Sequence, residues 1–554
     1  MKNRSLCAIL SFALCAFCGS IKVSAQSVNG NIHLNSLGFN IEQYKTATVL
    51  CPNGVENGDM HFSVINAKNG KEVISGSLSD SEFYQLTNQN IRKADFSELN
   101  KAGNYFIRVD GIGESGVFPV GKSVYKEPFI TAMRSFYLWR CGMAVETDYN
   151  GKHYATEACH LEDGWQKYRG LEGQVDGTGG WHDAGDYGKY TINAGVTMAS
   201  LFMAWEHFRP ALEKMDLSLP ETAPGYPQYL KELKWEMDFL FKMVYPDGSG
   251  KVSHKLTRLD FSGYIMPQAD KEERYFTDWS SEATANFAAT AAHAYRLFIE
   301  FDKEYARRCL DAARLSYDCV KREPGHSFRQ GDFLTGGYLT GYNDDIIWAS
   351  AELWESTGEK KYLDDLENAI RRSRNLVADD WDWGDVTNLA LYVYALSQRD
   401  GRDATLLSSV KQSVVKSAQN LVSNSQKDPY GRAMSRYYWG CNGTMCRQAI
   451  NLHVADMIQP DAEYQKTILK ILAHTFSDNY YNRSYVTGLG LNPPLHPHDR
   501  RSIADGIDAP WPGYLVGGGH SATDWVDEQE DYERNEIAIN WQAALIYLLA
   551  AVQK

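Results

Sequence analysis

The sequence predicts two domains of different class, an all-β sandwich over residues 26–122 and an all-α (α/α)6 barrel over residues 123–554. Three observations support this prediction. The chain has 554 residues, which is too many for a single ordinary core. Up to about residue 122 its apolar residues alternate with polar ones in short runs, as in half-buried strands. From Tyr125 onward they recur at three- and four-residue spacing, as in helices.

The β pattern is clearest in residues 46–50, 105–109 and 117–121. Turns rich in Asn, Gly and Asp separate such runs at the spacing that is typical of a sandwich. The run at 117–121 is expected to be the last strand and to lead into the linker.

The helical pattern covers about a dozen segments joined by loops of uneven length. This arrangement is typical of a closed ring of helical hairpins, the (α/α)6 barrel. The longest irregular stretches, 146–190, 246–280 and 480–534, contain nearly every motif discussed below, and sites are usually built on such loops. The predicted helices are 129–141, 194–208, 229–244, 283–301, 305–320, 344–356, 362–376, 386–396, 407–421, 447–457, 464–476 and 535–552.

The first 25 residues have the pattern of a signal peptide. Lys2 and Arg4 precede an apolar stretch at 6–17, and small residues at 23–25 form a cleavage site. We therefore expect an exported protein, secreted or periplasmic, whose mature chain begins near Gln26. Cys15 and Cys18 raise the alternative of a lipid anchor, but the residues before them are poorly suited to lipoprotein cleavage. The apolar stretch is too short to span a membrane, and no other span is expected.

Composition narrows the choice of partner. The formal net charge of −14 argues against nucleic acid and anionic membranes, whereas an aromatic content of 12% favours a polysaccharide cleft. We expect a monomer without an organic cofactor. Seven cysteines follow the signal peptide, and an odd number excludes a fully paired disulfide framework. Cys441 and Cys446 flank a short Asn-Gly loop and could pair in an oxidising compartment.

Two distant segments supply carboxyl groups for acid–base chemistry. In GGWHDAGDYGKY (179–190), Gly185 permits a tight turn, so Asp183 and Asp186 can point at one locus. A lone Asp-x-x-Asp is more often an Asx turn or a helix cap. In the second segment Glu536 begins an apolar helix, which could keep its carboxyl group protonated. Hydrolysis of an acetal needs one carboxylate as base and one carboxylic acid, so the two segments predict an inverting glycosidase.

These segments resemble glycoside hydrolase family nine, a cellulase family with an (α/α)6 catalytic barrel. Residues 179–190 resemble its base motif, 484–500 its histidine signature, 512–519 its loop before the acid, and 525–543 its carboxylate signature. Gln542 stands where the family usually has Asn. The resemblance runs from Lys126 to the C-terminus. Residues 35–39 and 95–97 resemble the immunoglobulin-like domain that often precedes this barrel.

The resemblance implies roles for the matching residues. Asp186 would be the base that takes a proton from water, Asp183 would help to hold that water, and Glu536 would be the acid. Water between base and acid needs the two carboxyl groups to stand roughly 6.5–9.5 Å apart, and the reaction then inverts the anomeric configuration. The further site residues are His498 and Arg500 as donors to sugar hydroxyls, with Asp527 as a supporting carboxylate and Tyr532 beside the substrate.

Two metals are predicted. Cys141, Cys159, His160 and His182 form a Cys2His2 set suited to structural zinc. Their spacing alone is weak evidence, but similar cellulases with the same N-terminal module carry zinc on this pattern.

Calcium is the second metal. The segment containing Thr340, Gly341, Asp344 and Asp345 resembles the family's calcium-binding segment, and Asp382 is a candidate for a further ligand. The alternative explanation is a helix N-terminus enriched in acidic residues for dipole reasons.

The sequence thus predicts an endo-β-1,4-glucanase for cellulose, mixed-linkage glucan or xyloglucan. One alternative is an exo-acting glucosidase or glucosaminidase of the same family. Another is a non-catalytic glycan-binding protein, against which the retention of all three carboxyl groups argues. Tryptophans in the long loops could stack on glucose rings, although most Trp in a helical barrel belong to the core, so none is assigned individually. These loop tryptophans are Trp279, Trp381, Trp383, Trp439 and Trp511.

Overall fold

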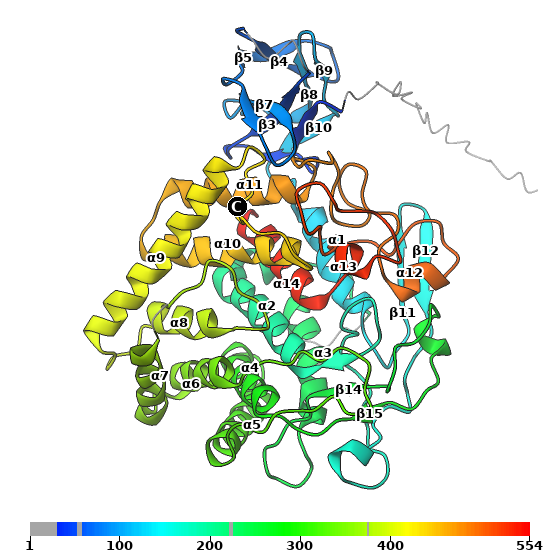
Figure 1. The fold of residues 1–554 in the computed structure, drawn as a ribbon, viewed down its shortest axis with the longest axis vertical. Helices are drawn as coiled ribbons and strands as arrows, with labels where there is room; N and C mark the ends of the chain where they lie inside the picture. Colours follow the sequence, from blue (N-terminus) through cyan, green and yellow to red (C-terminus); the bar gives the residue numbers. More distant parts are fainter. Residues whose placement is uncertain (1–29, 53–57, 221–224, 374–375, 554) are drawn as a thin grey trace, which may run out of the picture.

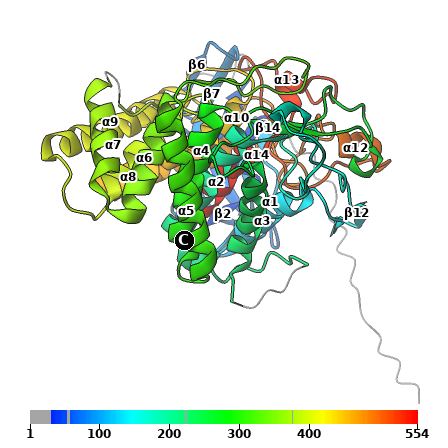
Figure 2. The ribbon, with the colours of Figure 1, turned by 90° about the horizontal axis from the view of Figure 1, so that it is seen from below.

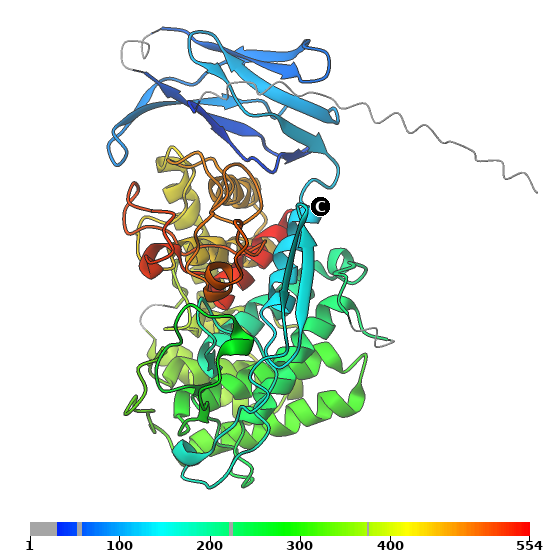
Figure 3. The ribbon, with the colours of Figure 1, turned by 90° about the vertical axis from the view of Figure 1, so that its right-hand side faces the viewer.

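The computed structural model describes residues 30–52, 58–220, 225–373 and 376–553, so the predicted signal peptide lies outside the described residues. Within them a β-sandwich rests on a larger helical domain (Figure 1, Figure 3). Each domain has its own hydrophobic core. Both parts of the predicted fold class are therefore confirmed.

The sandwich contains two sheets, ordered β1-β3-β7-β6 and β2-β10-β8-β4-β5, with β9 paired to β8. Pairing is antiparallel except between β2 and β10. The runs predicted at 46–50, 105–109 and 117–121 correspond to β3, β8 and β10. The strands are β1 (Ile32–Leu34), β2 (Phe39–Asn40), β3 (Thr46–Cys51), β4 (His61–Asn66), β5 (Glu72–Ser77), β6 (Glu82–Tyr84), β7 (Gln89–Asp95), β8 (Gly103–Val109), β9 (Gly113–Glu114) and β10 (Phe118–Gly121).

The helical domain is a barrel of two concentric rings. The inner helices α2, α4, α6, α8, α10 and α14 contact one another in this order, and α14 closes the ring against α2. The outer helices α1, α3, α5, α7, α9 and α11 each contact one or two inner helices (α3, α4 and α5 stand together in Figure 2). The bounds are α1 (Lys126–Leu138), α2 (Thr191–Leu212), α3 (Gln228–Met243), α4 (Ser281–Phe298), α5 (Lys303–Arg322), α6 (Asn343–Thr357), α7 (Lys360–Arg372), α8 (Thr387–Leu396), α9 (Ala404–Lys427), α10 (Cys441–Ile458), α11 (Ala462–Thr475) and α14 (Ile539–Ala551).

Position in the two rings explains the composition of the helices. The inner helices α4 and α14 are buried on nearly every side, and α4 is accordingly rich in alanine. The outer helices α5 and α7 bury one face only and are charged on the other. This is the amphipathic pattern that made the outer helices visible in the sequence.

The last predicted helix, 535–552, is wrong at its start. A short helix α13 (Tyr532–Asn535) ends just before Glu536, and α14 begins only at Ile539. The residues between them are extended because their backbone pairs with three other segments: His498 with Glu536, Val516 with Ile537, and Ala184 with Ala538. Glu536 therefore lies on an extended strand-like segment and does not begin an apolar helix.

The suggested disulfide is also wrong. Cys441 and Cys446 lie in the first turns of α10 and form no loop. The Cys441 thiol donates to the Gly519 carbonyl, and Cys446 Sγ contacts Thr475 Oγ1. All cysteines in the described ranges are buried, and none of them forms a disulfide.

The loops at one end of the barrel carry small additional elements. The hairpin β11 (Val145–Tyr149)–β12 (Lys152–Thr156) stands beside α1, and a three-stranded sheet is formed by β13 (Lys189–Tyr190), β14 (Lys255–Thr257) and β15 (Tyr275–Phe276). Short helices η1 (Lys167–Arg169), η2 (Pro267–Ala269) and α12 (Arg500–Ala504) complete these loops. Across the described parts of the chain, no helix is both long and apolar enough to cross a membrane.

The sandwich is joined to the barrel by specific polar contacts. Tyr84 of β6 donates to Asp428 Oδ2 at 2.6 Å, after the end of α9. The Ser36 amide donates to the Phe476 carbonyl at 2.8 Å, at the end of α11. These contacts place the sandwich over the α9–α11 side of the barrel (Figure 1).

Candidate active site

A cleft of about 790 Å³ opens at the barrel end where the inner helices begin. Its lining comes from the segments that immediately precede α2, α6, α8, α10 and α14. Asp183, Asp186 and Glu536 all contribute to this lining. The structure thus brings Glu536 to Asp183 and Asp186, which lie about 350 residues earlier in the sequence.

Asp183 is held by two side chains, one on each carboxylate oxygen. Asn193 donates to Oδ1 at 2.7 Å and the Tyr338 hydroxyl donates to Oδ2 at 2.6 Å. Burial, together with the negative charge of Asp186, raises the pKa of Asp183 to about 8. The two donors oppose this rise because they stabilise the ionised form.

Asp186 is oriented through one oxygen. The Gly188 amide and the Tyr190 hydroxyl both donate to Oδ2, at 3.0 Å each. Oδ1 accepts no hydrogen bond from the described residues, so this oxygen can accept one from a water molecule. The turn itself requires glycine at 185, since a Cβ there would stand 2.2 Å from the His498 carbonyl oxygen.

Glu536 faces the two aspartates from the extended segment before α14. Burial raises the pKa of its carboxyl group well above the usual range, and the charges of Asp186 and Asp183 raise it further. A glutamic acid in this setting keeps its proton near neutral pH. The three groups therefore provide both a proton acceptor and a proton donor in one cleft.

Arg500 stands behind the Asp183–Asp186 turn. Its Nη1 donates to the Gly185 carbonyl at 2.7 Å, and its Nε donates to the Ser262 carbonyl at 3.0 Å. These bonds hold the backbone between the two aspartates, whereas the sequence suggested a contact with sugar hydroxyls.

His498 presents a fixed tautomer. Its Nδ1 lies 2.6 Å from the Gln529 carbonyl and therefore carries the proton, so Nε2 is left as an acceptor. Burial lowers the pKa of His498, which keeps the ring neutral. Tyr532 lies edge-on to this ring at a centroid distance of 6.0 Å and is 46% exposed, so it is placed where a bound molecule can reach it.

Asp527 lies outside the cleft and joins two loops. It accepts hydrogen bonds from the backbone amides of Leu495 and His496 and forms an ion pair with Arg483 at 2.7 Å. Burial acts to raise its pKa, but these donors hold the pKa of Asp527 below the usual value. Asp527 thereby fixes the loop that leads to His498 and takes no part in the carboxyl cluster.

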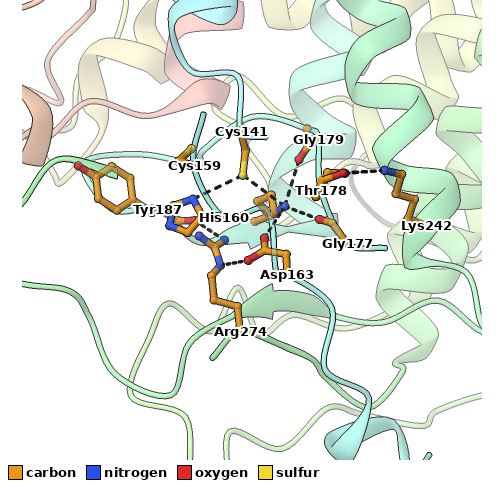
Figure 4. A network of polar contacts seen from close by, with 12 residues as sticks. Cys141, Cys159, His160, Asp163, Gly177, Thr178, Gly179, Tyr187, Lys242 and Arg274 are labelled. Atoms are coloured by element: carbon orange, nitrogen blue, oxygen red, sulfur yellow. Dashed lines mark hydrogen bonds and ion pairs between the residues drawn. The ribbon is translucent and has the colours of Figure 1, made fainter. Parts of the chain in front are cut away.

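The four residues proposed for zinc form one buried cluster. Their donor atoms all lie within 4.8 Å of one another, and in the described chain this is the one group found with the geometry of a metal site. Figure 4 shows Cys141, Cys159 and His160 together, with Tyr187 beside them. His160 Nδ1 lies 3.3 Å from His182 Nε2 and 3.6 Å from Cys141 Sγ.

The groups around this cluster favour metal binding. Burial lowers the pKa of His182 to about 4, so its imidazole is neutral and free to bind. His160 Nε2 faces Asp270 Oδ2 at 3.4 Å, the carboxylate support that metal-binding histidines commonly have. Because His182 directly precedes Asp183, the cluster also anchors the turn that carries the carboxyl groups.

The calcium candidates are only partly brought together. Asp344 accepts a hydrogen bond from the Val386 amide, and Asp345 accepts one from Asn286. Asp382 is directed elsewhere, into an ion pair with Arg447 at 3.0 Å. Thr340 donates to the Gly384 carbonyl, while Gly341 has open space around it. Calcium at this position stays a prediction.

Aromatic side chains line the cleft together with the carboxyl groups. Trp381, Trp383 and Trp439 belong to this lining, and Trp439 is 46% exposed. Trp279 and Trp511 are buried in the protein and do not line the cleft.

Sequence reasoning missed Tyr190, Tyr338 and Trp541. Tyr190 ends the GGWHDAGDYGKY motif and could have been noticed there. Tyr338 follows two glycines in an irregular stretch, and no periodicity distinguishes it. Trp541 reads as one more apolar residue of the last helix.

An all-α barrel with a buried acid–base cluster beside an aromatic wall defines a glycoside hydrolase. Residues 125–549 match the family described as "Glycosyl hydrolase family 9", and residues 27–114 match "Cellulase N-terminal ig-like domain". The chain belongs to glycosyl hydrolase family 9.

Relatives and solved structures agree with this assignment. The chain is 44% identical over 568 residues to Endoglucanase D of Acetivibrio thermocellus, covering 99% of this chain and 86% of the relative. A metagenome-derived glycoside hydrolase family 9 endoglucanase superposes with a TM-score of 0.88 at 31% identity, covering 94% and 98% of the two chains. A Zn-binding triple mutant of a family 9 endoglucanase superposes with a TM-score of 0.86 at 30% identity, covering 93% and 99%.

The Tyr338 hydrogen bond predicts a pH effect. Tyr338→Phe removes the donor that lowers the pKa of Asp183. The pKa of Asp183 then rises further, and the acidic side of the pH–activity profile should move to higher pH by about one unit. Hydrolysis rates measured across pH check this. Tyr317→Phe is the matched control, because Tyr317 also donates to an aspartate, Asp365, outside the cleft. If the acidic side of the pH–activity profile did not move in Tyr338→Phe, the role of the Tyr338 hydroxyl in lowering the pKa of Asp183 would be contradicted.

Proposed function

We propose that this protein hydrolyses internal β-1,4-glucosidic bonds of β-glucans with inversion of configuration. The observation that supports this most strongly is the cluster of Asp183, Asp186 and Glu536, in which burial and mutual repulsion raise the pKa of Glu536. The similarity to Endoglucanase D supports internal cleavage over the exo-acting alternative.

Each carboxyl group has one role in this proposal. Asp186, whose Oδ1 accepts no hydrogen bond from the described part of the chain, takes the proton from the attacking water. Asp183 accepts the water's other hydrogen bond and is kept in place by Asn193 and Tyr338. Glu536 gives its proton to the leaving oxygen, and the high pKa of its carboxyl group keeps that proton available.

The remaining residues bind and support. His498 Nε2 accepts a hydrogen bond from a sugar hydroxyl, and the exposed rings of Trp439 and Tyr532 contact the apolar faces of glucose units. Arg500 supports the reaction indirectly, because its bond to the Gly185 carbonyl holds the backbone between the two aspartates. Export through the N-terminal signal is part of this proposal, because β-glucan polymers lie outside the cell.

A substrate panel tests the function directly. Carboxymethylcellulose, barley glucan, xyloglucan and cello-oligosaccharides are each incubated with the protein, and reducing ends and viscosity are measured together. Internal cleavage lowers viscosity well before many reducing ends appear. An exo-acting enzyme would release reducing ends without that early fall, and a glycan-binding protein would change neither.

The carboxyl roles predict the effect of three substitutions. Asp186→Ala and Glu536→Ala should each lower turnover on polymeric glucan by several orders of magnitude with folding intact, because each removes a group that transfers a proton. Asp183→Ala should be damaging but milder. Asp508→Asn, at an exposed carboxylate, is the control. Near-normal turnover of Glu536→Ala on unactivated polymer would refute its role as acid.

Stereochemistry gives a separate prediction. If water attacks from the face opposite the leaving group, the first product of a β-glucan carries the α-anomeric configuration. Proton NMR of early hydrolysis products detects this before mutarotation. First appearance of the β-anomer would instead require a covalent intermediate and would exclude Asp186 as a base acting on water.

We further propose that the Cys2His2 cluster holds one structural zinc. Tetrahedral zinc places two nitrogen ligands about 3.3 Å apart and a nitrogen and a sulfur about 3.6 Å apart. The corresponding distances are 3.3 Å between His160 and His182, 3.6 Å between Cys141 and His160, and 3.9 Å between Cys159 and His182. Four protein ligands leave no open position, so the metal would brace the turn and take no part in bond cleavage.

Metal analysis checks the zinc proposal. Purified protein that has never met a chelator should contain about one zinc per chain. Cys159→Ala should lower the melting temperature and reduce activity, because the turn loses its anchor. Cys309→Ala, at a buried thiol outside the cluster, should leave the zinc content unchanged. Zinc-free native protein would contradict the proposal.

Calcium beside α6 is a weaker proposal. It is supported by burial that raises the pKa of Asp344 to about 6 and the pKa of Asp345 well above the usual range, since a cation would relieve two such adjacent acids. Asp385, which adds to the rise at Asp344, replaces Asp382 as the further candidate ligand.

A further inference from the structure

One irregular loop contacts Asp183 directly and Asp186 through the hydroxyl of Tyr190. In the loop before α6, the Tyr338 hydroxyl donates to Asp183 Oδ2 at 2.6 Å. The Gly336 amide donates to the Tyr190 hydroxyl at 3.1 Å, and that hydroxyl donates to Asp186 Oδ2 at 3.0 Å. A shift of this loop would therefore disturb both aspartates together.

The loop needs to be held in place. Tyr338 has φ of 44°, a left-handed conformation that is unfavourable for a bulky side chain. The stretch from Phe328 to Tyr338 contains no helix or strand, so contacts with other segments set its position, among them the bond from the Leu334 amide to the Leu259 carbonyl at 2.7 Å.

Two consecutive residues at the start of β14 hold it. Lys255 Nζ donates to Gln330 Oε1 at 2.8 Å, Thr335 Oγ1 at 3.0 Å and the Gly336 carbonyl at 2.8 Å, which uses all three ammonium protons. His254 Nε2 lies 2.6 Å from the Gly337 carbonyl. Lys255 Nζ also lies 3.3 Å from the Thr335 carbonyl, so the clamp contacts the backbone on both sides of the Gly336 amide that reaches Tyr190.

Burying the ammonium group of Lys255 at this position has a desolvation cost. Its side chain is fully buried, and the acceptors named above are neutral oxygens. Burial lowers the pKa of Lys255 to about 7, and the nearby Asp186 opposes this fall. An apolar side chain would fill the same space without the cost of desolvating an ammonium group. The directed contacts to the loop give the lysine a function that packing alone does not explain.

We propose that Lys255 is a positioning residue of the hydrolytic reaction, which clamps the 330–338 loop so that Tyr190 and Tyr338 orient Asp186 and Asp183. The inference rests on the proposed function of these carboxyl groups. It adds a residue that touches neither the substrate nor the aspartates and acts through two phenols.

Lys255→Met tests this, since methionine fills similar space but donates nothing. We expect kcat on soluble β-glucan to fall about 10- to 100-fold with KM changed less than about threefold. The acidic side of the pH–rate profile should move to higher pH because Asp183 loses the Tyr338 donor that supports its ionised form. Lys45→Met is the matched control, as Lys45 is equally buried and donates to the Gln43 carbonyl in the sandwich. It should leave kcat and the pH profile unchanged.

A double variant separates positioning from general stability. If Lys255 acts through the phenols, Lys255→Met combined with Tyr338→Phe should lose less activity than the product of the two single losses. Multiplicative losses, or an unchanged kcat and pH profile in folded Lys255→Met, would overturn the proposal. Should Lys255→Met not fold, Thr335→Val removes one acceptor of the clamp and should shift kcat and pH profile in the same direction.

A crystal structure of Lys255→Met decides the positioning role without any substrate. The Tyr338 hydroxyl should move out of hydrogen-bond distance of Asp183 Oδ2. If it stays in place, the clamp is not needed and the proposal fails, whatever the glucan assays show. If the wild-type protein hydrolysed none of the glucans, the proposed function would be refuted, whereas the positioning role of Lys255 would still be decided by the crystal structure.

Discussion

Three carboxyl groups meet in one cleft at the mouth of the barrel, where burial and their mutual repulsion raise the pKa of two of them. Asp183 and Glu536 both have raised pKa values from burial and from the neighbouring carboxylates. Such a cluster is costly to bury, so each aspartate is matched by donors that favour its ionised form. Glu536 has no comparable set of side-chain donors among the described residues, and this favours its protonated form. The proposed division into base and acid rests on this unequal supply of donors.

The barrel supplies the frame for this cluster. Five inner helices begin directly after segments that line the cleft, so their amino-terminal ends point toward it. Helix amino-terminal ends carry partial positive charge, which favours anionic groups placed near them. Segments scattered over the whole helical domain can therefore meet at one end of the fold, as Asp183 before α2 and Glu536 before α14 do.

Much of this could be predicted from the sequence, because the relevant signals are local. Periodicity located the helices, and GGWHDAGDYGKY located the two aspartates. Glu536 was identified, but its backbone was not, since the apolar pattern continues across 536–538 and hides the pairing with distant segments. The family resemblance assigned Arg500 to sugar hydroxyls and Asp382 to calcium. In the fold, Arg500 donates to the Gly185 carbonyl and Asp382 forms an ion pair with Arg447. No local sequence pattern reveals these two partners. Tyr338 and Lys255 act across the fold and leave no periodic trace.

The extended segment at 536–538 has a consequence for how this enzyme can diversify. Ala538 pairs with Ala184, and the Ile539 amide donates to the Asp183 carbonyl at 2.9 Å, so the acid and base segments are joined main chain to main chain. The gap between them is set by peptide geometry, which is the same for every side chain. Tryptophans and tyrosines that line the cleft can then be substituted to fit another glucan. Because these substitutions leave the gap between the proposed acid and base unchanged, the stereochemical course of the reaction stays the same.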